Sequence, residues 1–300
     1  MSFMKIAVSG SRGFIGSALV AFLMTQKHDI VRLVRSRSGA NSQDVSWDPK
    51  TGAVDKPALE GFDAVIHLAG EPIAKGRWTA AKKAKIRDSR IQGTKLLAQT
   101  ISQLNNPPRV VISASAIGIY GNRGDEILTE ESAAGTGFLA EVGRQWEAAA
   151  DPMKQRGIRV VCARTGIVMD SSGGALALMT PIFRMGTGGN LGNGKQFMSW
   201  ISLEDEVGAF HHALTTNSLE GPVNFTAPHP VTNGEFTKTM GRVLHRPTIF
   251  PLPAFAARIL FGEMADEALL ASSRVEPRKL LESGYKFRHP DLEGALRFGL

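Results

Sequence analysis

Short apolar runs alternate with longer segments of helical apolar spacing through the first half of the chain. Each short run, such as Ile6-Ala7-Val8, is typical of a buried parallel strand, whereas apolar positions three and four residues apart predict helices. Strands that alternate with helices favour an α/β protein with a doubly wound parallel sheet covered on both faces. The pattern predicts strands at residues 6–9, 30–34, 45–47, 64–68, 110–113 and 160–164, and helices at 14–24, 79–104 and 138–155.

The second half of the chain has a different pattern. A glycine-rich stretch at residues 186–194 ends in the turn signal Gly192-Asn193-Gly194. Ser202 and Asp205 have the spacing of a capping box that opens a helix reaching about Leu214. Beyond Pro247 repeated prolines predict short helices.

A glycine-rich segment follows the first predicted strand and opens the first predicted helix. Glycines let backbone N–H groups approach an anion, and the positive end of a helix stabilises a pyrophosphate. The spacing is G-x-x-G-x-x-G instead of the usual dinucleotide pattern G-x-G-x-x-G. Its position between strand and helix nevertheless predicts a dinucleotide site formed by Gly10, Ser11, Arg12, Gly13, Phe14, Ile15 and Gly16.

Basic residues follow the second predicted strand, where a site that prefers NAD carries an acid for the ribose 2′-hydroxyl. Here the residues are Arg35, Ser36 and Arg37, and Arg12 can converge on the same place. Guanidinium groups recognise a phosphate through charge-assisted hydrogen bonds. The sequence therefore favours NADP(H) as the cofactor.

Ligands of such sheets bind outside the carboxyl ends of the strands, so the residues there are the candidates. His67 lies inside an apolar run and is interpreted as a packed residue. The expected cofactor contacts at these strand ends are Leu68, Ala69, Gly70, Glu71, Ser113, Arg164 and Thr165. The expected substrate contacts are Lys75, Arg77, Trp78 and Trp200.

Several of these motifs together are similar to the extended short-chain dehydrogenase/reductases. They are the glycine loop, Leu68-Ala69-Gly70, the stretch from Ser113 to Gly121, and Trp200-Ile201-Ser202-Leu203-Glu204-Asp205. Further segments resemble an atypical subgroup, the YfcH-like "epimerase family" of the NAD-dependent epimerase/dehydratase superfamily. These segments include Trp47-Asp48-Pro49, Gly70-Glu71-Pro72-Ile73, Ser89-Arg90-Ile91-Gln92-Gly93-Thr94, Trp146-Glu147 and Gly262-Glu263-Met264.

The resemblance spans essentially the whole chain and implies a Rossmann domain with bound NADP(H) and a smaller C-terminal substrate domain. On this basis we expect a cofactor domain at residues 1–166, completed by a segment returning near 198–228. Residues 167–300 are then mainly the substrate domain.

One departure from the larger superfamily concerns its Tyr-x-x-x-Lys pair, which exchanges the proton in ordinary members. The chain has two tyrosines, Tyr120 and Tyr285, and neither has a lysine four residues later. The YfcH-like subgroup shares this omission. Ser115, at the superfamily's serine position, and Tyr120 are the remaining catalytic candidates. The proton then has to come from Tyr120, Glu71, Lys75 or water.

Charge and composition restrict the partners. The net charge of +7 is spread along the chain apart from residues 75–90, where a solvated helix face explains it, so nucleic acid is not expected. No apolar run approaches the length of about 20 residues that spans a bilayer, so no membrane partner is expected. No His/Cys cluster has metal spacing. The single Cys162 in an apolar run and the early first strand suggest a cytoplasmic protein, monomeric or homodimeric.

Two functions stay open. The first is redox chemistry on a small polar substrate such as a nucleotide sugar, as a reductase or an epimerase. The second is an NADP(H)-sensing regulatory protein that kept the cofactor site and lost the catalytic pair. The fold alone does not separate them, because one fold carries many chemistries.

Overall fold

The computed structural model describes residues 3–35, 44–74 and 76–300. Ser36, Arg37 and Lys75, which were expected to contact cofactor or substrate, lie outside the described residues.

An eight-stranded sheet forms the centre of the molecule, in the order β12-β8-β6-β5-β1-β2-β3-β4. The strand pairs are parallel except β3 with β4. The predicted doubly wound α/β fold is confirmed. The bounds are β1 Lys5–Ser9, β2 Asp29–Val34, β3 Val45–Asp48, β4 Ala53–Val54, β5 Ala64–His67, β6 Val110–Ala116, β8 Arg159–Thr165 and β12 Gly221–Phe225.

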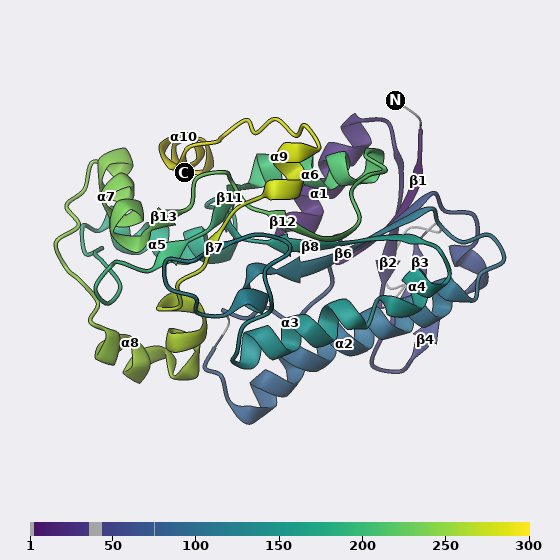
Figure 1. The fold of residues 1–300 in the computed structure, drawn as a ribbon, viewed down its shortest axis with the longest axis horizontal. Helices are drawn as coiled ribbons and strands as arrows, with labels where there is room; N and C mark the ends of the chain where they lie inside the picture. The colour runs from purple at the N-terminus through teal and green to yellow at the C-terminus, as the bar shows by residue number, and fades with distance from the viewer. Residues whose placement is uncertain (1–2, 36–43, 75) are drawn as a thin grey trace.

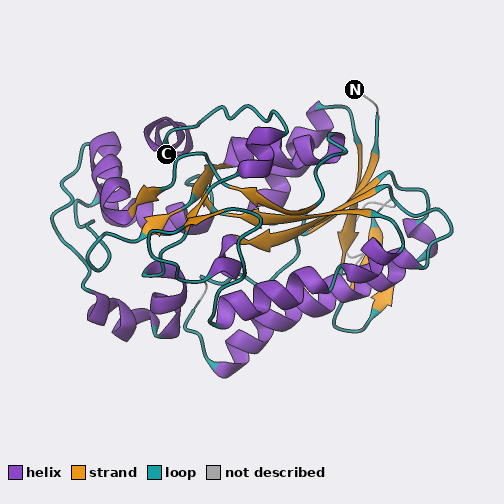
Figure 2. Ribbon diagram, viewed as in Figure 1, coloured by secondary structure: helices purple, strands orange, loops and turns teal. Residues whose placement is uncertain are grey.

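Helices cover both faces of this sheet (Figures 1 and 2). Helices α1 (Phe14–Thr25) and α6 (Leu203–Thr215) lie on one face. Helices α2 (Ala80–Ser102), α3 (Phe138–Ala148) and α4 (Asp151–Gln155) lie on the other. Alternate strand residues serve the two cores: Ile6 faces α1 and α6, whereas its neighbour Ala7 faces α2.

The prediction of one helix over residues 138–155 is wrong, because the structure has two helices there, α3 and α4. Pro152 has no N–H to donate to the carbonyl of Ala148, so the helical hydrogen-bond ladder cannot continue. At the end of α3 the chain forms a tighter turn, in which Ala150 N donates to Glu147 O, three residues earlier. Helix α6 begins as predicted, with Ser202 Oγ accepting a hydrogen bond from Asp205 N at 3.0 Å.

Several of the remaining elements, among them α5, α7, α8 and α10, gather at one end of the molecule, on the left in Figure 1. Leu128 lies in β7 and pairs with Val275 in β14, so the two halves of the chain are joined there. None of the described helices is long and apolar enough to cross a membrane. The short strands are β7 Ile127–Leu128, β9 Ile167–Met169, β10 Phe197–Met198, β11 Trp200–Ser202, β13 Val231–Thr232 and β14 Arg274–Val275. The helices are α5 Gly174–Arg184, α7 Asn233–Leu244, α8 Ala254–Phe261, α9 Arg278–Glu282 and α10 Leu292–Gly299, with single turns at Pro57–Leu59, Ile117–Tyr120 and Ala265–Leu269.

Candidate functional site

The glycine loop packs directly against neighbouring backbone. Gly10 has a φ of 68°, and a Cβ there would lie 2.8 Å from the carbonyl carbon of Leu68. A Cβ on Gly16 would lie 2.2 Å from the carbonyl oxygen of Gly10. Gly13 N donates to the same oxygen at 2.9 Å, which closes the turn. The loop therefore packs against the Leu68-Ala69 turn, and neither Gly10 nor Gly16 has room for a side chain.

The N-terminus of α1 behind this loop is open. None of the described side chains caps it, and its first turn contains no acidic residue. The N–H groups of Phe14, Ile15 and Gly16 belong to the turn that has no partner within the helix. The chain passes from β1 to β2 on one side and from β5 to β6 on the other, so the loop after β1 lies at the point where the strand order reverses and such sheets bind ligands.

Two arginines lie at the same edge of the sheet as the loop. Arg12 belongs to the loop and Arg35 follows β2, the strand paired with β1, and both side chains are exposed. Ser11, between Gly10 and Arg12, is 6% exposed. The described part of this edge thus has cations and backbone donors side by side, a combination that suits phosphate groups.

The turn after β5 is held by side chains from α2. Ser89 Oγ accepts a hydrogen bond from Glu71 N at 3.0 Å, and Arg90 donates to Glu71 O at 3.0 Å. Lys82 forms an ion pair with Glu71 at 2.7 Å. The sequence analysis assigned no role to Ser89, Arg90 or Lys82, because residues 11 to 19 positions away carry no local sign of this contact.

The expected substrate contacts lie in different environments. Arg77 is exposed and its guanidinium lies close to Gly262. Trp78 is 9% exposed, and its Nε1 donates to Ile73 O. Trp200 is fully buried, and its Nε1 donates to His229 O. Trp200 therefore packs the core of the second half and presents no surface to a ligand.

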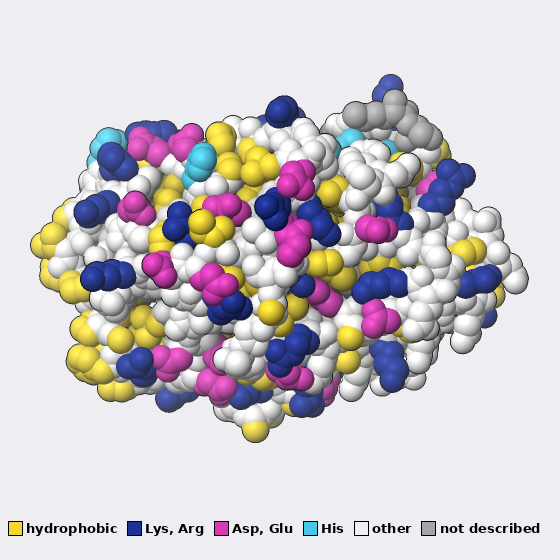
Figure 3. All heavy atoms as spheres, in the orientation of Figure 1, with side chains coloured by type: hydrophobic (Ala, Val, Ile, Leu, Met, Phe, Trp, Pro, Cys, Tyr) yellow, Lys and Arg dark blue, Asp and Glu magenta, His cyan; other side chains and the backbone are white. Residues whose placement is uncertain are grey.

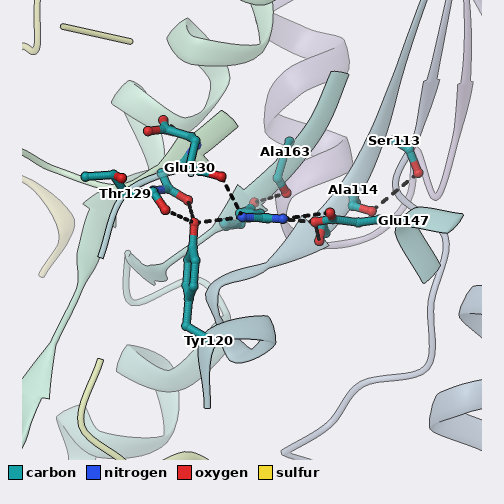
Figure 4. A network of polar contacts seen from close by, with 11 residues as sticks. Ser113, Ala114, Tyr120, Thr129, Glu130, Glu147 and Ala163 are labelled. Atoms are coloured by element: carbon teal, nitrogen blue, oxygen red, sulfur yellow. Dashed lines mark hydrogen bonds and ion pairs between the residues drawn. The ribbon is translucent and has the colours of Figure 1, made fainter. Parts of the chain in front are cut away.

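A polar network surrounds Arg164 at the end of β8 (Figure 4). Its Nε and Nη2 donate to the two carboxylate oxygens of Glu147, both at 2.8 Å. Its Nη1 donates to the hydroxyl of Tyr120 at 2.9 Å. Burial opposes the charge on Arg164, but the hydrogen bonds and the charge of Glu147 and the contact with Tyr120 raise its pKa overall. Figure 4 shows Tyr120 and Glu147 reaching this centre from opposite sides.

The two catalytic candidates both belong to this network. Ser115 Oγ donates to Glu147 Oε1 at 2.7 Å, and its side chain lies among buried residues. Tyr120 is fully buried, and its hydroxyl also lies within hydrogen-bond distance of Thr129 O and Asn224 Oδ1. Burial raises the pKa of Tyr120, with Arg164 opposing this in part. Both hydroxyl groups are thus engaged inside the protein.

The other strand-end candidates lie nearby. Ser113 is buried and its Oγ makes one long contact of 3.4 Å to Ala114 O. Thr165 Oγ1 donates to Glu206 Oε1 at 2.8 Å. Glu206 is fully buried, its Oε2 has no hydrogen-bond partner among the described residues, and burial raises its pKa to about 8. The sequence analysis missed Glu206, although it interrupts the inward apolar stripe of α6 between Leu203 and Phe210.

The histidine interpreted as a packed residue and the single cysteine are both buried. His67 is buried, its Nδ1 lies 2.6 Å from Ser9 Oγ, and burial lowers its pKa to about 4. Cys162 is a buried free thiol whose pKa burial raises to about 12. Among the described residues no group of His, Cys, Asp and Glu could hold a metal ion.

Comparison with known families supports the interpretation of the glycine loop. The pattern of the NAD dependent epimerase/dehydratase family matches residues 6–225, which include the loop and the whole eight-stranded sheet except the first residue of β1. The chain belongs to this family. A second pattern, a domain of unknown function called DUF1731, matches residues 252–298.

Relatives match over almost the full chain. An epimerase family protein of Mycobacterium bovis is 47% identical, covering 98% of this chain and 96% of that protein. The human epimerase family protein SDR39U1 is 33% identical, covering 98% and 99% of the two chains.

Solved structures extend the likeness to three dimensions. The crystal structure of human SDR39U1 (isoform 2) with NADPH matches with a TM-score of 0.90 and 33% identity, over 99% of both chains. A nucleoside-diphosphate sugar epimerase from Corynebacterium glutamicum matches with a TM-score of 0.81 and 35% identity, over 99% of this chain and 59% of that one.

Proposed function

We propose that this family member binds NADP(H) in the crevice between β1 and β5 and transfers hydride to or from a small polar substrate such as a nucleotide sugar. The observation that carries the proposal is the uncapped N-terminus of α1 behind a loop that has no room for a side chain at Gly10 or Gly16. The NADPH bound in the similar human structure supports the same cofactor. The division into a cofactor domain of residues 1–166 with 198–228, and a substrate domain from the rest of 167–300, is part of this proposal.

The preference for NADP(H) over NAD(H) rests on Arg12 and Arg35 with Ser36 and Arg37. The guanidinium groups of the arginines would hold a 2′-phosphate, while the N–H groups of Phe14, Ile15 and Gly16 would hold the pyrophosphate. The turn at Leu68, Ala69 and Gly70, fixed by Arg90, would bound the nicotinamide side of the crevice. When bound, the cofactor supplies or accepts the hydride.

The chain must itself position the reacting oxygen. Ser115 keeps its oxygen lone pairs available while its hydrogen points to Glu147, so it can accept a hydrogen bond from a substrate hydroxyl. We assign this polarising role to Ser115 and a packing role to Tyr120, whose hydroxyl has three protein partners. The proton would come from the Glu71–Lys82 pair, Lys75 or water.

The alternative function, an NADP(H) sensor without turnover, is favoured by one observation. The hydroxyls of Ser115 and Tyr120 are both engaged within the protein, so neither is poised to exchange a proton with a substrate. Under either proposal the protein works in the cytoplasm as a monomer or homodimer, and its one cysteine is buried.

The test is a titration of purified protein with NADPH and NADH, followed by fluorescence. Arg35→Ala should weaken NADPH by about 10- to 100-fold and leave NADH nearly unchanged, because a guanidinium–phosphate contact is lost. Arg109→Ala, at an exposed arginine beside β6, is the matched control. Equal losses for both nucleotides would remove the 2′-phosphate argument.

The same protein is then screened for NADPH oxidation with sugars and carbonyl compounds. Turnover, or stereospecific hydride exchange with a sugar, supports the oxidoreductase. Tight NADPH binding without turnover on any of them supports the sensor.

A further inference from the structure

Large apolar side chains are exposed together at the end of the molecule remote from the N-terminus. They come from α5, α8 and the loop between α7 and α8, and each is 46–72% exposed. Figure 3 shows apolar atoms along the left margin and at the lower left, over these elements. We call this set the apolar rim: Ile182, Met185, Ile249, Phe250, Phe255 and Ile259.

The rim is one surface because its segments are hydrogen-bonded to each other. Phe250 N donates to Gly188 O, and Leu252 N donates to Asn190 O at 2.8 Å. The chain after α5 therefore runs beside the chain that leads into α8. Ile182 and Met185 are one helical turn apart, as are Phe255 and Ile259, so each pair shares a helix face.

A basic cluster lies next to the rim. Lys238, Arg242, Arg246 and Arg297 line a hollow of about 490 Å³ whose edge also includes Pro247. Arg246 Nε donates to Arg184 O at 2.9 Å, which joins the hollow to the residue before Met185. We call these five basic side chains the basic cluster: Arg184, Lys238, Arg242, Arg246 and Arg297.

The cluster has an excess of positive charge. Among the described residues, Glu293 provides the side-chain carboxylate within ion-pair distance of it, 3.3 Å from Arg242 and 2.7 Å from Arg297, and Arg184 Nη2 donates to Leu300 O at 3.2 Å. Asp266 pairs with Arg258, and Glu235, which accepts hydrogen bonds at the start of α7, also interacts with the charge of Lys238. The five cations of the cluster thus outnumber the carboxylates of Glu293 and Glu235 and leave uncompensated positive charge beside exposed apolar groups.

We propose that this end of the molecule docks on an anionic phospholipid bilayer, with the apolar rim entering the headgroup layer and the basic cluster binding lipid phosphates. Apolar side chains flanked by arginine and lysine are the combination that holds a protein at such a surface without spanning it. A second copy of the chain fits less well, because a symmetric contact would bring the same uncompensated cations together. The proposal revises the expectation of no membrane partner, which rested on the lack of a spanning segment.

The test is co-sedimentation of the full chain with phosphatidylcholine vesicles, with and without phosphatidylglycerol, at low and high salt. We expect binding only to the anionic vesicles, weakened by salt. Ile249→Ser with Phe250→Ser, and separately Lys238→Glu, should each reduce binding by about 10-fold. These side chains are exposed, so thermal unfolding should be unchanged.

Two controls isolate the surface. Met24→Ser removes a side chain that is 60% exposed on α1, and Lys50→Glu makes the same charge change beyond β3, so both should bind like the parent protein. If excess inorganic phosphate abolishes vesicle binding and high salt does not, the cluster binds a soluble phosphate ligand and the proposal is overturned. Absence of vesicle binding, or a dimer broken by the rim substitutions, would also overturn it. Neither result depends on NADPH affinity.

Discussion

Two neighbouring parts of the same sheet edge differ in whether their polar groups are paired within the protein. At β1 and β5 the glycine loop leaves backbone N–H groups at an open helix end, with Arg12 and Arg35 exposed beside them. At β6 and β8 the side chains of Ser115, Glu147 and Arg164 satisfy one another. The first region leaves the N–H groups of a helix end uncapped beside exposed cations, whereas the second is filled by its own side chains.

The difference shows that a cofactor motif and a catalytic position are maintained by different forces. The loop is constrained by backbone contact, because any side chain at Gly16 would meet the Gly10 carbonyl. The network is constrained by charge, because Arg164 and Glu147 are mostly buried and each needs the other.

The sharpest test of the cofactor region is Gly16→Ala. Its Cβ would lie 2.2 Å from the Gly10 oxygen, so the loop must shift and its N–H groups lose their alignment. NADPH affinity should fall about 1,000-fold, equivalent to about 4 kcal/mol, in a fluorescence titration. Gly294→Ala is the control, since that glycine is also helical but has only ordinary contacts. Retained affinity in Gly16→Ala would show that the loop does not need its close approach.

The substitution Arg164→Met tests the polar network around Arg164. Removing the guanidinium leaves Glu147 and the Tyr120 hydroxyl without their shared partner, so the free energy of unfolding should fall by about 3 kcal/mol. Urea unfolding measures the loss. Adding Glu147→Leu should restore part of it, because the unpaired carboxylate is also removed. A NADPH affinity that falls together with stability would contradict the separation of the two regions.

The sequence predicted the structure of the glycine loop better than it predicted the network. Strand, glycine loop and helix follow one another within a few residues, so local spacing was enough to predict them. Glu147 reaches Ser115 across 32 positions and Asn224 reaches Tyr120 across 104, and no local pattern carries such contacts. The break after Ala148 was missed because apolar spacing continues through Met153, although Pro152 removes one hydrogen bond of the ladder.

Glu206 sharpens the comparison because it is a buried acid beside the network, with one oxygen that has no hydrogen-bond partner among the described residues. Its folded pKa of about 8 lies above that of the unfolded chain, so the folded state binds the extra proton. Stability should therefore decline as pH rises from about 5 to about 8, by up to about 1.4 kcal/mol per pH unit from this group. Glu206→Gln should remove that slope, as read from urea unfolding across this range.

The Glu206 experiment has a surface control. Glu220→Gln changes an exposed carboxyl beside β12 and should keep the parent's pH dependence. The glutamine at position 206 can still accept the hydrogen bond from Thr165 Oγ1, so a large loss of stability at pH 5 is not expected. Parallel pH profiles for parent and Glu206→Gln would show that Glu206 is ionised in the fold.

Ser115→Ala should have the smallest effect on stability and is the most direct test of where the two regions meet. It removes one hydrogen bond to Glu147 and leaves the Glu147–Arg164 pair, so unfolding should cost about 1 kcal/mol less. NADPH affinity should stay within about twofold, since the serine lies outside the glycine loop. Ser102→Ala is the control, because that hydroxyl donates to Gln99 O within α2. If the serine polarises the substrate oxygen, hydride exchange falls in Ser115→Ala and not in Ser102→Ala; equal rates in both variants would make Ser115 a packing residue.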